Sequence, residues 1–265
     1  MTRLLLAAAV TPLTDDGERL DEAAFAPLTH YLRDGGVDGL FCCGTTGEGV
    51  LLTLEERRRV AELFREACDG ILIVHAGAQT TRDTVTLARH ARDLEADGVG
   101  VIPPPYYPLD DDALVEHLCA AAAACAPIDF YLYAFTARSG YPVPISVIER
   151  VRERADNLAG LKVSERSPAE IEAFIGTGLP VLIGSEPLIP EAFAAGAAGA
   201  VSGMASAYPA EVAAVVRDPS AAGADALRAL RATLEPAFIP MVKARLVSAG
   251  VPIRPDVRRP LLPVR

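Results

Sequence analysis

The amino-acid sequence predicts an α/β chain that closes into a (β/α)8 barrel, the TIM-barrel class, followed by a C-terminal helical extension. Short apolar runs recur eight times at nearly even intervals, and uniformly apolar runs of about 4 to 8 residues are typical of parallel strands covered on both faces. An amphipathic helical pattern follows each run. No dinucleotide-binding glycine fingerprint follows the first run, which favours a closed barrel over the alternative, an open doubly wound sheet.

The predicted strands share an apolar character on both faces. They are Leu4–Val10, Gly39–Cys43, Ile71–Ala76, Gly98–Ile102, Phe130–Phe135, Leu158–Val163, Val181–Ile183 and Gly199–Ser202.

The predicted helices lie after these strands and carry apolar residues at three- and four-residue spacing. Thr53 and Glu56 have the spacing of a capping box at one helix start, and Gly98 and Gly196 stand where helices are expected to stop. The helices are Glu22–Arg33, Leu54–Cys68, Arg82–Glu95, Asp111–Ala124, Ser146–Arg154, Pro168–Ile175, Pro187–Ala195 and Ala210–Val216.

The segment after the eighth unit continues as two more helical patterns, Ala224–Leu234 and Phe238–Ala249, and a tail rich in Pro and Arg. We expect the barrel to occupy residues 1–218, with residues 219–265 packed on its outside. No low-complexity linker separates the two parts, so the chain is predicted to be a single domain.

The composition limits the partners. A net charge of −10 disfavours nucleic acid and anionic membranes, which bind basic faces, and no apolar stretch approaches the roughly 18 residues of a membrane span. We therefore expect small-molecule substrates. The five cysteines are an odd number without metal-site spacing, which indicates reduced thiols in the cytoplasm. The histidines form no metal motif with nearby acids, so no metal is expected.

Lys162 is the most informative residue, because the sequence holds only one other lysine, Lys243, among 25 basic residues. In such barrels the reactive groups sit at the carboxyl ends of the strands, and Lys162 ends the sixth apolar run. An amine there loses hydration, which favours its neutral form and makes it a nucleophile for a ketone. The alternative is a structural ion pair with Glu48 or Glu186.

The neighbouring strand ends supply candidates for proton transfer. An imine-forming lysine needs a proton carrier, and Tyr133 ends the strand next to that of Lys162. The hydroxyls of Thr45 and Tyr107 could relay protons to it. For Tyr133 taken alone, a core aromatic is the alternative interpretation.

The loop from Gly44 to Glu48 is predicted to bind the substrate. Its hydroxyls and unhindered N–H groups suit a carboxylate, which places Thr46, Gly47 and Glu48 in the binding site; the alternative is a tight connection that merely needs glycines. Arg138 could hold a second carboxylate. Two further strand-end residues complete the predicted substrate pocket: Gly184 and Val201.

These residues together resemble the pyruvate-dependent class I aldolase family that includes dihydrodipicolinate synthase and N-acetylneuraminate lyase. The most specific stretch is Gly39–Gly49, which reads GLFCCGTTGEG, with Glu56 downstream. The other motifs follow in the family's order along nearly the whole chain: Pro104–Tyr107, Tyr133, Arg138, Gly160–Lys162, Pro240–Lys243 and Arg259–Pro263.

The resemblance implies that Lys162 forms a Schiff base with pyruvate, that Tyr133 and Thr45 relay protons, and that Thr46 helps to hold the pyruvate carboxylate. It also implies that Tyr107 is lent by a neighbouring subunit of a homo-oligomer, a dimer or tetramer. Apart from the covalent imine, no cofactor is expected. Lys243 is expected to have a structural role.

Several positions differ from the synthase pattern. Ala134 stands in place of Asn, Phe135-Thr136 in place of a segment that contains Pro, and Val163 in place of an acidic residue. The first expected activity is dihydrodipicolinate synthase, which joins pyruvate to aspartate semialdehyde, and the second is a 2-keto-3-deoxy sugar-acid aldolase. A phosphate-binding barrel enzyme, suggested by glycines in the last two units, and a non-catalytic keto-acid-binding protein remain as alternatives.

Overall fold

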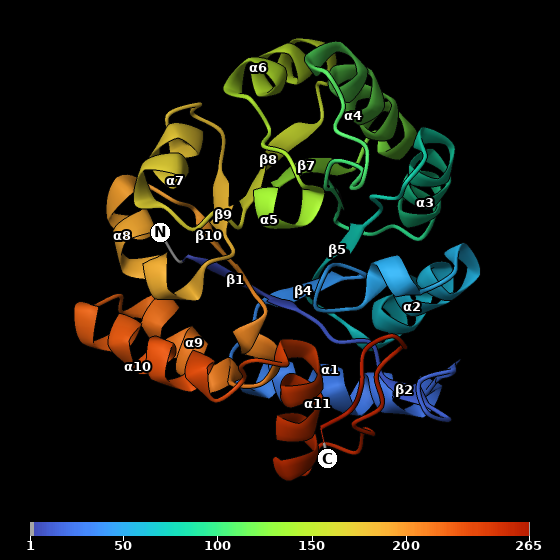
Figure 1. Cartoon of the computed structure of the whole chain (residues 1–265), viewed down its shortest axis with the longest axis vertical. Helices are drawn as coiled ribbons and strands as arrows, with labels where there is room; N and C mark the ends of the chain where they lie inside the picture. Colours follow the sequence, from blue (N-terminus) through green and yellow to red (C-terminus); the bar gives the residue numbers. More distant parts are fainter. Residues whose placement is uncertain (1–2, 265) are drawn as a thin grey trace.

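The computed structural model describes residues 3–264 and shows a closed barrel of parallel strands, which confirms the predicted fold class (Figure 1). Around the barrel the strands follow the order β1-β10-β9-β8-β7-β6-β5-β4. They are β1 (Leu4–Ala8), β4 (Gly39–Cys42), β5 (Ile71–His75), β6 (Gly98–Val101), β7 (Asp129–Ala134), β8 (Leu158–Val163), β9 (Val181–Ile183) and β10 (Gly199–Ser202).

Helices surround the strands as an outer ring. The predicted capping box is confirmed, because the Thr53 hydroxyl accepts from the Glu56 N–H at 3.1 Å and the Glu56 carboxylate accepts from the Thr53 N–H at 2.8 Å. The helices of the ring are α1 (Phe25–Asp34), α2 (Leu54–Ala67), α3 (Thr81–Asp93), α4 (Asp111–Cys125), α6 (Ile145–Arg154), α7 (Pro168–Ile175), α8 (Ile189–Ala195) and α9 (Pro209–Arg217).

Two local expectations were wrong. The first helix starts as a 3-10 turn, η1 (Glu22–Ala24), before α1. Gly98 opens β6 instead of ending a helix, and a Cβ there would lie 2.9 Å from the Tyr131 ring, so the close approach of β7 explains the glycine. The short elements that were not predicted include the hairpin of β2 (Leu13–Thr14) and β3 (Arg19–Leu20), and the one-turn helix α5 (Thr136–Ser139).

Two apolar clusters form the core, one inside the barrel and one between the strands and helices. Side chains alternate between the two: Leu6 and Phe41 point inward, whereas Leu5 and Leu40 point toward the helices. The same alternation places the neighbours of Lys162 in the outer cluster, which directs Lys162 itself to the barrel interior. The inner cluster comprises Leu6, Ala8, Phe41, Ile73, Ile102, Tyr133, Leu182 and Val201.

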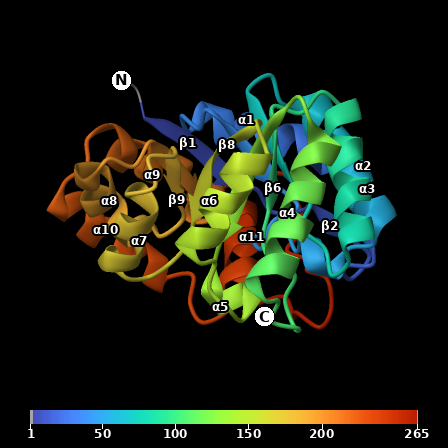
Figure 2. The ribbon, with the colours of Figure 1, turned by 90° about the horizontal axis from the view of Figure 1, so that it is seen from above.

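The C-terminal part adds α10 (Ala221–Ala232), α11 (Phe238–Ser248) and a tail. α10 packs on α8 and α9, and α11 contacts the 3-10 turn η4 (Met204–Ser206). Figure 2 shows the tail on the same side of the barrel as α5, and its residues 260–262 line the cavity at that side. The C-terminal part therefore contributes to the barrel mouth as well as to the outer wall.

All five cysteines are free thiols, four of them buried, so they serve as small apolar side chains in the packing. No helix in residues 3–264 combines the length and the apolar character that crossing a membrane requires. In the same range, no cluster of three or more His, Cys, Asp or Glu has the arrangement of a metal site.

Candidate active site

A cavity of about 950 Å³ opens at the carboxyl ends of the strands, which is the face where barrels of this kind carry their reactive groups. Its walls come from the strand ends, from α5 and from the C-terminal part. Seven of the predicted site residues line it: Thr45, Thr46, Tyr133, Arg138, Lys162, Gly184 and Val201.

Lys162 projects into this cavity from the end of β8. Its Cα pairs with that of Tyr133 on β7, and its Nζ lies 3.4 Å from the centroid of the Tyr133 ring and 4.7 Å from that of Phe41. The residue is only 5% exposed. Burial lowers the pKa of Lys162, and the nearby Tyr133 and Glu186 oppose that shift only partly. The amine is thus more readily deprotonated than that of a surface lysine.

The alternative interpretation, that Lys162 is held in a structural ion pair, is wrong for both proposed partners. Glu48 instead binds Lys243 with an Nζ–Oε1 distance of 2.6 Å. Glu186 accepts hydrogen bonds from the Ser202 hydroxyl at 2.8 Å and the Met204 N–H at 3.0 Å. Within residues 3–264, no carboxylate oxygen lies within 4.0 Å of the Lys162 amine, so its charge is not compensated by a contact ion pair.

Tyr133 is 2% exposed and stands among other rings. Its ring makes edge-to-face contacts with Phe41 and His75, each with a centroid distance of 6.0 Å. Burial lowers the pKa of His75 well below its usual value, and the charges of Arg57 and Lys162 add to that effect. His75 is therefore neutral at physiological pH. His75 is thus a buried side chain of the barrel interior.

The loop after β4 brings Thr45 and Thr46 to the cavity but not Gly47 or Glu48. The Gly47 carbonyl accepts a hydrogen bond from the Thr11 hydroxyl at 2.7 Å. A Cβ on Gly47 would lie 2.9 Å from the Ala9 carbonyl oxygen. Gly47 is therefore required for the close approach of the loop to β1, and the two threonines remain as the candidate carboxylate ligands.

Glu48 was predicted to contact the substrate, and the structure places it elsewhere. It is buried with its backbone in the left-handed region at φ 57°. Besides the ion pair with Lys243, its Oε2 accepts a hydrogen bond from the Arg258 N–H at 2.7 Å. The Lys243 amine also donates to the Asp256 carbonyl at 2.6 Å. Glu48 thus ties the C-terminal tail to the loop after β4, and Lys243 has the structural position expected for it.

Tyr107 does not line the cavity of its own chain. It is 74% exposed, and its ring contacts that of Tyr106 edge-to-face with a centroid distance of 4.9 Å. A single chain therefore does not bring its hydroxyl to Lys162, and a role at a neighbouring subunit's site stays a prediction.

The glycines that suggested a phosphate site have packing explanations. A Cβ on Gly203 would lie 3.0 Å from the Thr46 hydroxyl, and one on Gly199 would lie 2.5 Å from the Leu4 carbonyl oxygen. Gly196 ends α8 at φ 111°, in the left-handed region that glycine favours. These positions therefore need no phosphate to account for them.

Sequence reasoning missed several residues of the cavity. Arg166 lies four residues beyond Lys162, a strand-end position that could have pointed to it, whereas Arg231 on α10 and Leu261 in the tail gave no local signal. Together with Arg138, the two arginines give the lining three guanidinium groups against two carboxylates, Glu186 and Glu235. Such a concave cationic site in a chain of net charge −10 attracts anionic ligands.

Comparisons with known proteins agree with this geometry. The chain is 32% identical over 208 residues to an N-acetylneuraminate lyase of Pongo abelii, which covers 74% of the chain and 64% of that protein. It is 31% identical to a 4-hydroxy-tetrahydrodipicolinate synthase of Salinibacter ruber, covering 97% and 88%. The match thus spans less than two thirds of the lyase's length and most of the synthase's.

Among solved structures, the chain superimposes on YagE, a prophage protein of the dihydrodipicolinic acid synthase family from E. coli K12 in complex with pyruvate. The TM-score is 0.92 at 25% identity, covering 100% of this chain and 94% of that one. A family model described as the dihydrodipicolinate synthetase family matches residues 1–265. The chain therefore belongs to the dihydrodipicolinate synthetase family.

Proposed function

We propose that this protein is a pyruvate-dependent, aldolase-type lyase or synthase that binds its 2-oxo acid covalently on Lys162. The observation that carries the proposal is the Lys162 amine itself, which is buried at a cavity with no carboxylate within ion-pair distance in residues 3–264 and has a lowered pKa. Imine formation requires the neutral form of the amine, and the lowered pKa of Lys162 makes that form easier to reach.

The reaction begins when the amine nitrogen attacks the C2 carbonyl carbon of the 2-oxo acid. The carbinolamine that forms loses its hydroxyl as water, and the resulting iminium withdraws electrons from C3. Loss of a C3 proton gives the enamine, whose C3 attacks the carbonyl carbon of an aldehyde; the reverse sequence cleaves that bond. Hydrolysis of the iminium then releases the product and restores the free amine.

Tyr133 is proposed to carry the protons of these steps. Its ring is in direct contact with the Lys162 amine, at 3.4 Å from Nζ to the centroid, which keeps its hydroxyl near the reacting atoms. Thr45 lines the same cavity and could connect that hydroxyl to the substrate. Positioned acids and bases of this type contribute roughly 10² to 10⁴-fold to a rate.

Thr46, together with Thr45 and the N–H groups of their loop, is proposed to hold the substrate carboxylate. Gly184 and Val201 line the same cavity. A carboxylate fixed at this loop would orient the adjacent carbonyl toward Lys162. The pyruvate complex of the structural relative YagE supports a 2-oxo acid as the substrate of this cavity.

For the aldehyde half, we propose aspartate semialdehyde first, which would make the enzyme a dihydrodipicolinate synthase. The near full-length match to the Salinibacter synthase and the cationic cavity support it. Cleavage of a longer keto-deoxy sugar acid is the second candidate, supported by the 950 Å³ volume of the cavity and by the likeness to N-acetylneuraminate lyase.

The remaining assignments are proposals of the same kind. We propose a cytoplasmic enzyme without a cofactor other than the covalent imine, and without nucleic-acid or membrane partners, in keeping with the net charge of −10. We also propose a homo-oligomer, dimer or tetramer. Exposed apolar side chains support it, because Val50, Tyr106 and Tyr107 are each more than 70% exposed and suit contact with a second copy.

The test is incubation with pyruvate and borohydride, followed by intact-protein and peptide mass measurement. Reduction of the imine should add one pyruvate-derived group, located on Lys162. Lys243 is an internal control, since it is buried in an ion pair and should stay unmodified. An unchanged mass would refute the proposal. Synthesis from aspartate semialdehyde, measured against cleavage of 2-keto-3-deoxy acids, then separates the two candidate reactions.

A further inference from the structure

We infer that His75 is a positioning residue of the active site. Through the Cys43 carbonyl, its ring holds the start of the threonine loop that is proposed to bind the substrate carboxylate. Through a ring contact, it supports Tyr133 beside the Lys162 amine. The inference rests on the proposed function for the reaction that the kinetic tests measure, and it adds a residue to which that function gives no role.

Both ring nitrogens of His75 have a partner at a neighbouring strand end. Nδ1 lies 3.2 Å from the carbonyl oxygen of Cys43, directly after β4, and Nε2 lies 3.4 Å from the backbone nitrogen of Ile102, directly after β6. A carbonyl can only accept and an N–H can only donate, so Nδ1 carries the proton and Nε2 the lone pair. His75 thus links the ends of β4 and β6 from β5, which lies between them in the barrel.

This arrangement favours the neutral ring. In an imidazolium both nitrogens carry protons, and the Nε2 proton would then face the proton of the Ile102 N–H. Burial, with smaller contributions from the charges of Arg57 and Lys162, lowers the pKa of His75 well below its usual value, in agreement with the neutral form. A neutral imidazole whose two nitrogens are both occupied is not free to carry protons for the reaction, so its contacts serve to position other groups.

The contact with Cys43 acts on the threonine loop. Cys43 has its backbone in the left-handed region at φ 56°, and the loop with Thr45 and Thr46 begins directly after it. Cys43 is 1% exposed, and its carbonyl oxygen lies so close to the Gly49 backbone that a Cβ on Gly49 would collide with it. Because the loss of a hydrogen bond to a buried carbonyl is costly, the bond from His75 fixes the point from which the loop starts.

The ring of His75 also contacts the two aromatic rings that border the Lys162 amine. Its centroid lies 6.0 Å from that of Tyr133 at an interplanar angle of 87°, and 6.0 Å from that of Phe41 at 45°. The Lys162 Nζ lies 3.4 Å and 4.7 Å from the centroids of the same two rings, in that order. His75 therefore packs against both rings and limits how they can turn relative to the amine.

The backbone at His75 is itself held by a buried guanidinium. Arg57 on α2 is 4% exposed, and its two terminal nitrogens donate to the carbonyls of His75 at 2.6 Å and Gly77 at 3.0 Å. Gly77 leaves space for the ring, since a Cβ there would lie 2.9 Å from the His75 Nε2. An aliphatic side chain would fill the same space without these polar contacts, so the contacts indicate a positioning role.

The kinetic test uses amide side chains that each reproduce one half of the ring. Asn places an N–H at the position of Nδ1, Gln places an amide oxygen at that of Nε2, and Leu has neither. His75→Leu should raise the KM for pyruvate roughly 10-fold, because the threonine loop loses its hydrogen bond. His75→Asn should restore that KM to near wild type, whereas His75→Gln should not.

The ring contact predicts a different pattern for the chemical step. All three variants remove the ring from beside Tyr133, so the rate of borohydride trapping at saturating pyruvate should fall roughly 3- to 10-fold in each. The KM and the trapping rate therefore report separately on the two contacts of His75. Equal pyruvate KM values for His75→Leu and His75→Asn, or wild-type kinetics of folded His75→Leu, overturn the inference.

His117 supplies the matched control. It is also a buried histidine, 3% exposed on α4, with its Nδ1 at 2.9 Å from the Thr81 hydroxyl, and it does not line the cavity. His117→Leu removes a buried polar side chain as His75→Leu does, but it should leave the KM for pyruvate and the trapping rate unchanged in the folded enzyme. If both variants change the kinetics alike, the effect is a general consequence of losing a buried histidine, and the inference fails.

The protonation state of His75 can be measured independently of the imine proposal. In heteronuclear NMR of histidine-labelled protein at neutral pH, the His75 signals are identified by their loss in His75→Asn. They should be those of the Nδ1–H tautomer. An imidazolium or the Nε2–H tautomer overturns the inference, whatever the outcome of the borohydride experiment.

A binding measurement distinguishes failure of this inference from failure of the imine proposal. Lactate has the carboxylate of pyruvate but no keto group, so it cannot form an imine. In calorimetric titration, His75→Leu should bind lactate roughly 10-fold more weakly than wild type, and His75→Asn should not. This loss without a borohydride adduct in the wild type refutes only the imine. A normal adduct together with unchanged lactate binding refutes only the positioning role.

Discussion

The two lysines of this chain provide a natural comparison, because both are buried and only one is paired. Lys162 is 5% exposed and Lys243 is fully buried. Lys243 binds Glu48 at 2.6 Å and the Asp256 carbonyl at 2.6 Å, whereas the Lys162 amine lies against the rings of Tyr133 and Phe41 beside a large cavity. Burial lowers the pKa of both amines, and Glu48 is the main influence that opposes the shift at Lys243.

The difference teaches that burial alone does not make a nucleophile. A buried ammonium with a carboxylate at contact distance keeps its proton and supports the fold. A buried amine without that carboxylate loses its proton more readily, and it becomes reactive when a cavity gives substrate access to it. The two sites are linked through one loop, since Glu48 follows the threonines of the proposed substrate site by only a few residues.

The largest effect should come from removing the unpaired amine. Lys162→Met should abolish the borohydride adduct and lower aldolase turnover by roughly 10³ to 10⁶-fold, the range seen when a covalent nucleophile is lost. The free energy of unfolding should stay equal or rise, because the variant no longer buries an uncompensated amine. Steady-state kinetics and urea unfolding check the two parts, and an active Lys162→Met enzyme would contradict the proposed roles of the lysines.

Removing the paired amine should have the opposite signature. Lys243→Met leaves the Glu48 carboxylate buried without its partner, and such a loss costs about 3–5 kcal/mol of unfolding free energy. The folded fraction should still form the adduct on Lys162. Urea unfolding of this variant, compared with the double variant Glu48→Gln/Lys243→Met, provides the control. No recovery in the double variant would mean that the loss comes from packing rather than from the stranded charge.

The hydroxyl next to the unpaired amine should matter to the chemistry but not to the fold. Tyr133→Phe keeps the ring against Lys162 and removes only the proton carrier, so turnover should fall about 100-fold. The adduct should still form at a lower rate, and the thermal midpoint should change little. Rapid-quench borohydride trapping measures the rate of adduct formation. If this variant traps pyruvate and turns over substrate at the wild-type rates, Tyr133 has no role in the mechanism.

The lowered pKa of Lys162 predicts a pH dependence with a definite sign. Between the lowered folded-state value and the ordinary 10.5, the unfolded chain binds more protons at this residue than the folded one. The stability contributed by Lys162 therefore increases as pH rises through that window. Lys162→Met removes this contribution, so the stability difference between wild type and variant should change with pH. Parallel stability curves from neutral pH to pH 10 would be evidence against the shift.

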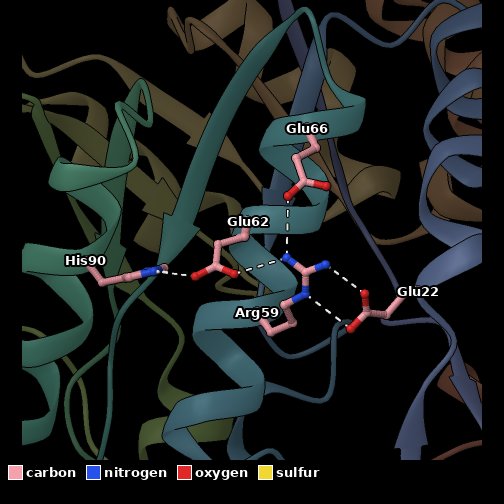
Figure 3. Close-up of polar contacts among 5 residues, drawn as sticks. All are labelled: Glu22, Arg59, Glu62, Glu66 and His90. Atoms are coloured by element: carbon pink, nitrogen blue, oxygen red, sulfur yellow. Dashed lines mark hydrogen bonds and ion pairs between the residues drawn. The ribbon is translucent and has the colours of Figure 1, made fainter.

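The smallest effect should come from a charge cluster at the surface. Arg59 on α2 binds Glu22 at 2.7 Å, Glu62 at 3.2 Å and Glu66 at 3.4 Å, and Glu62 also contacts His90 at 3.1 Å (Figure 3). Solvent and salt screen such contacts. Arg59→Gln should therefore shift the unfolding midpoint far less than Lys243→Met, and any shift should shrink in high salt. If Arg59→Gln lowers the unfolding midpoint as much as Lys243→Met does, the number of ion pairs in a cluster contributes more to stability than the burial of a single pair.

The sequence by itself determined the barrel and the strand-end part of the candidate site. Strand and helix periodicity is a local property, and parallel closure places every strand end at one face, so Lys162, Tyr133, Thr45 and Thr46 could be assigned to one cavity before any coordinates. The short turn α5 was not foreseen, because a four-residue helix has no periodicity to detect.

Only the tertiary structure decided the partners of the buried charges. Glu48 was predicted to be a substrate ligand because the local sequence places it just after a strand end. Its actual partners lie in α11 and in the tail, and Arg258 is 210 residues away in the sequence. The Glu165–Thr136 contact likewise spans 29 residues and two loops. The local sequence pattern predicts which face of a strand or helix a side chain occupies. Its hydrogen-bond partner depends on which distant segments barrel closure and packing bring within hydrogen-bonding distance. No local pattern predicts that partner.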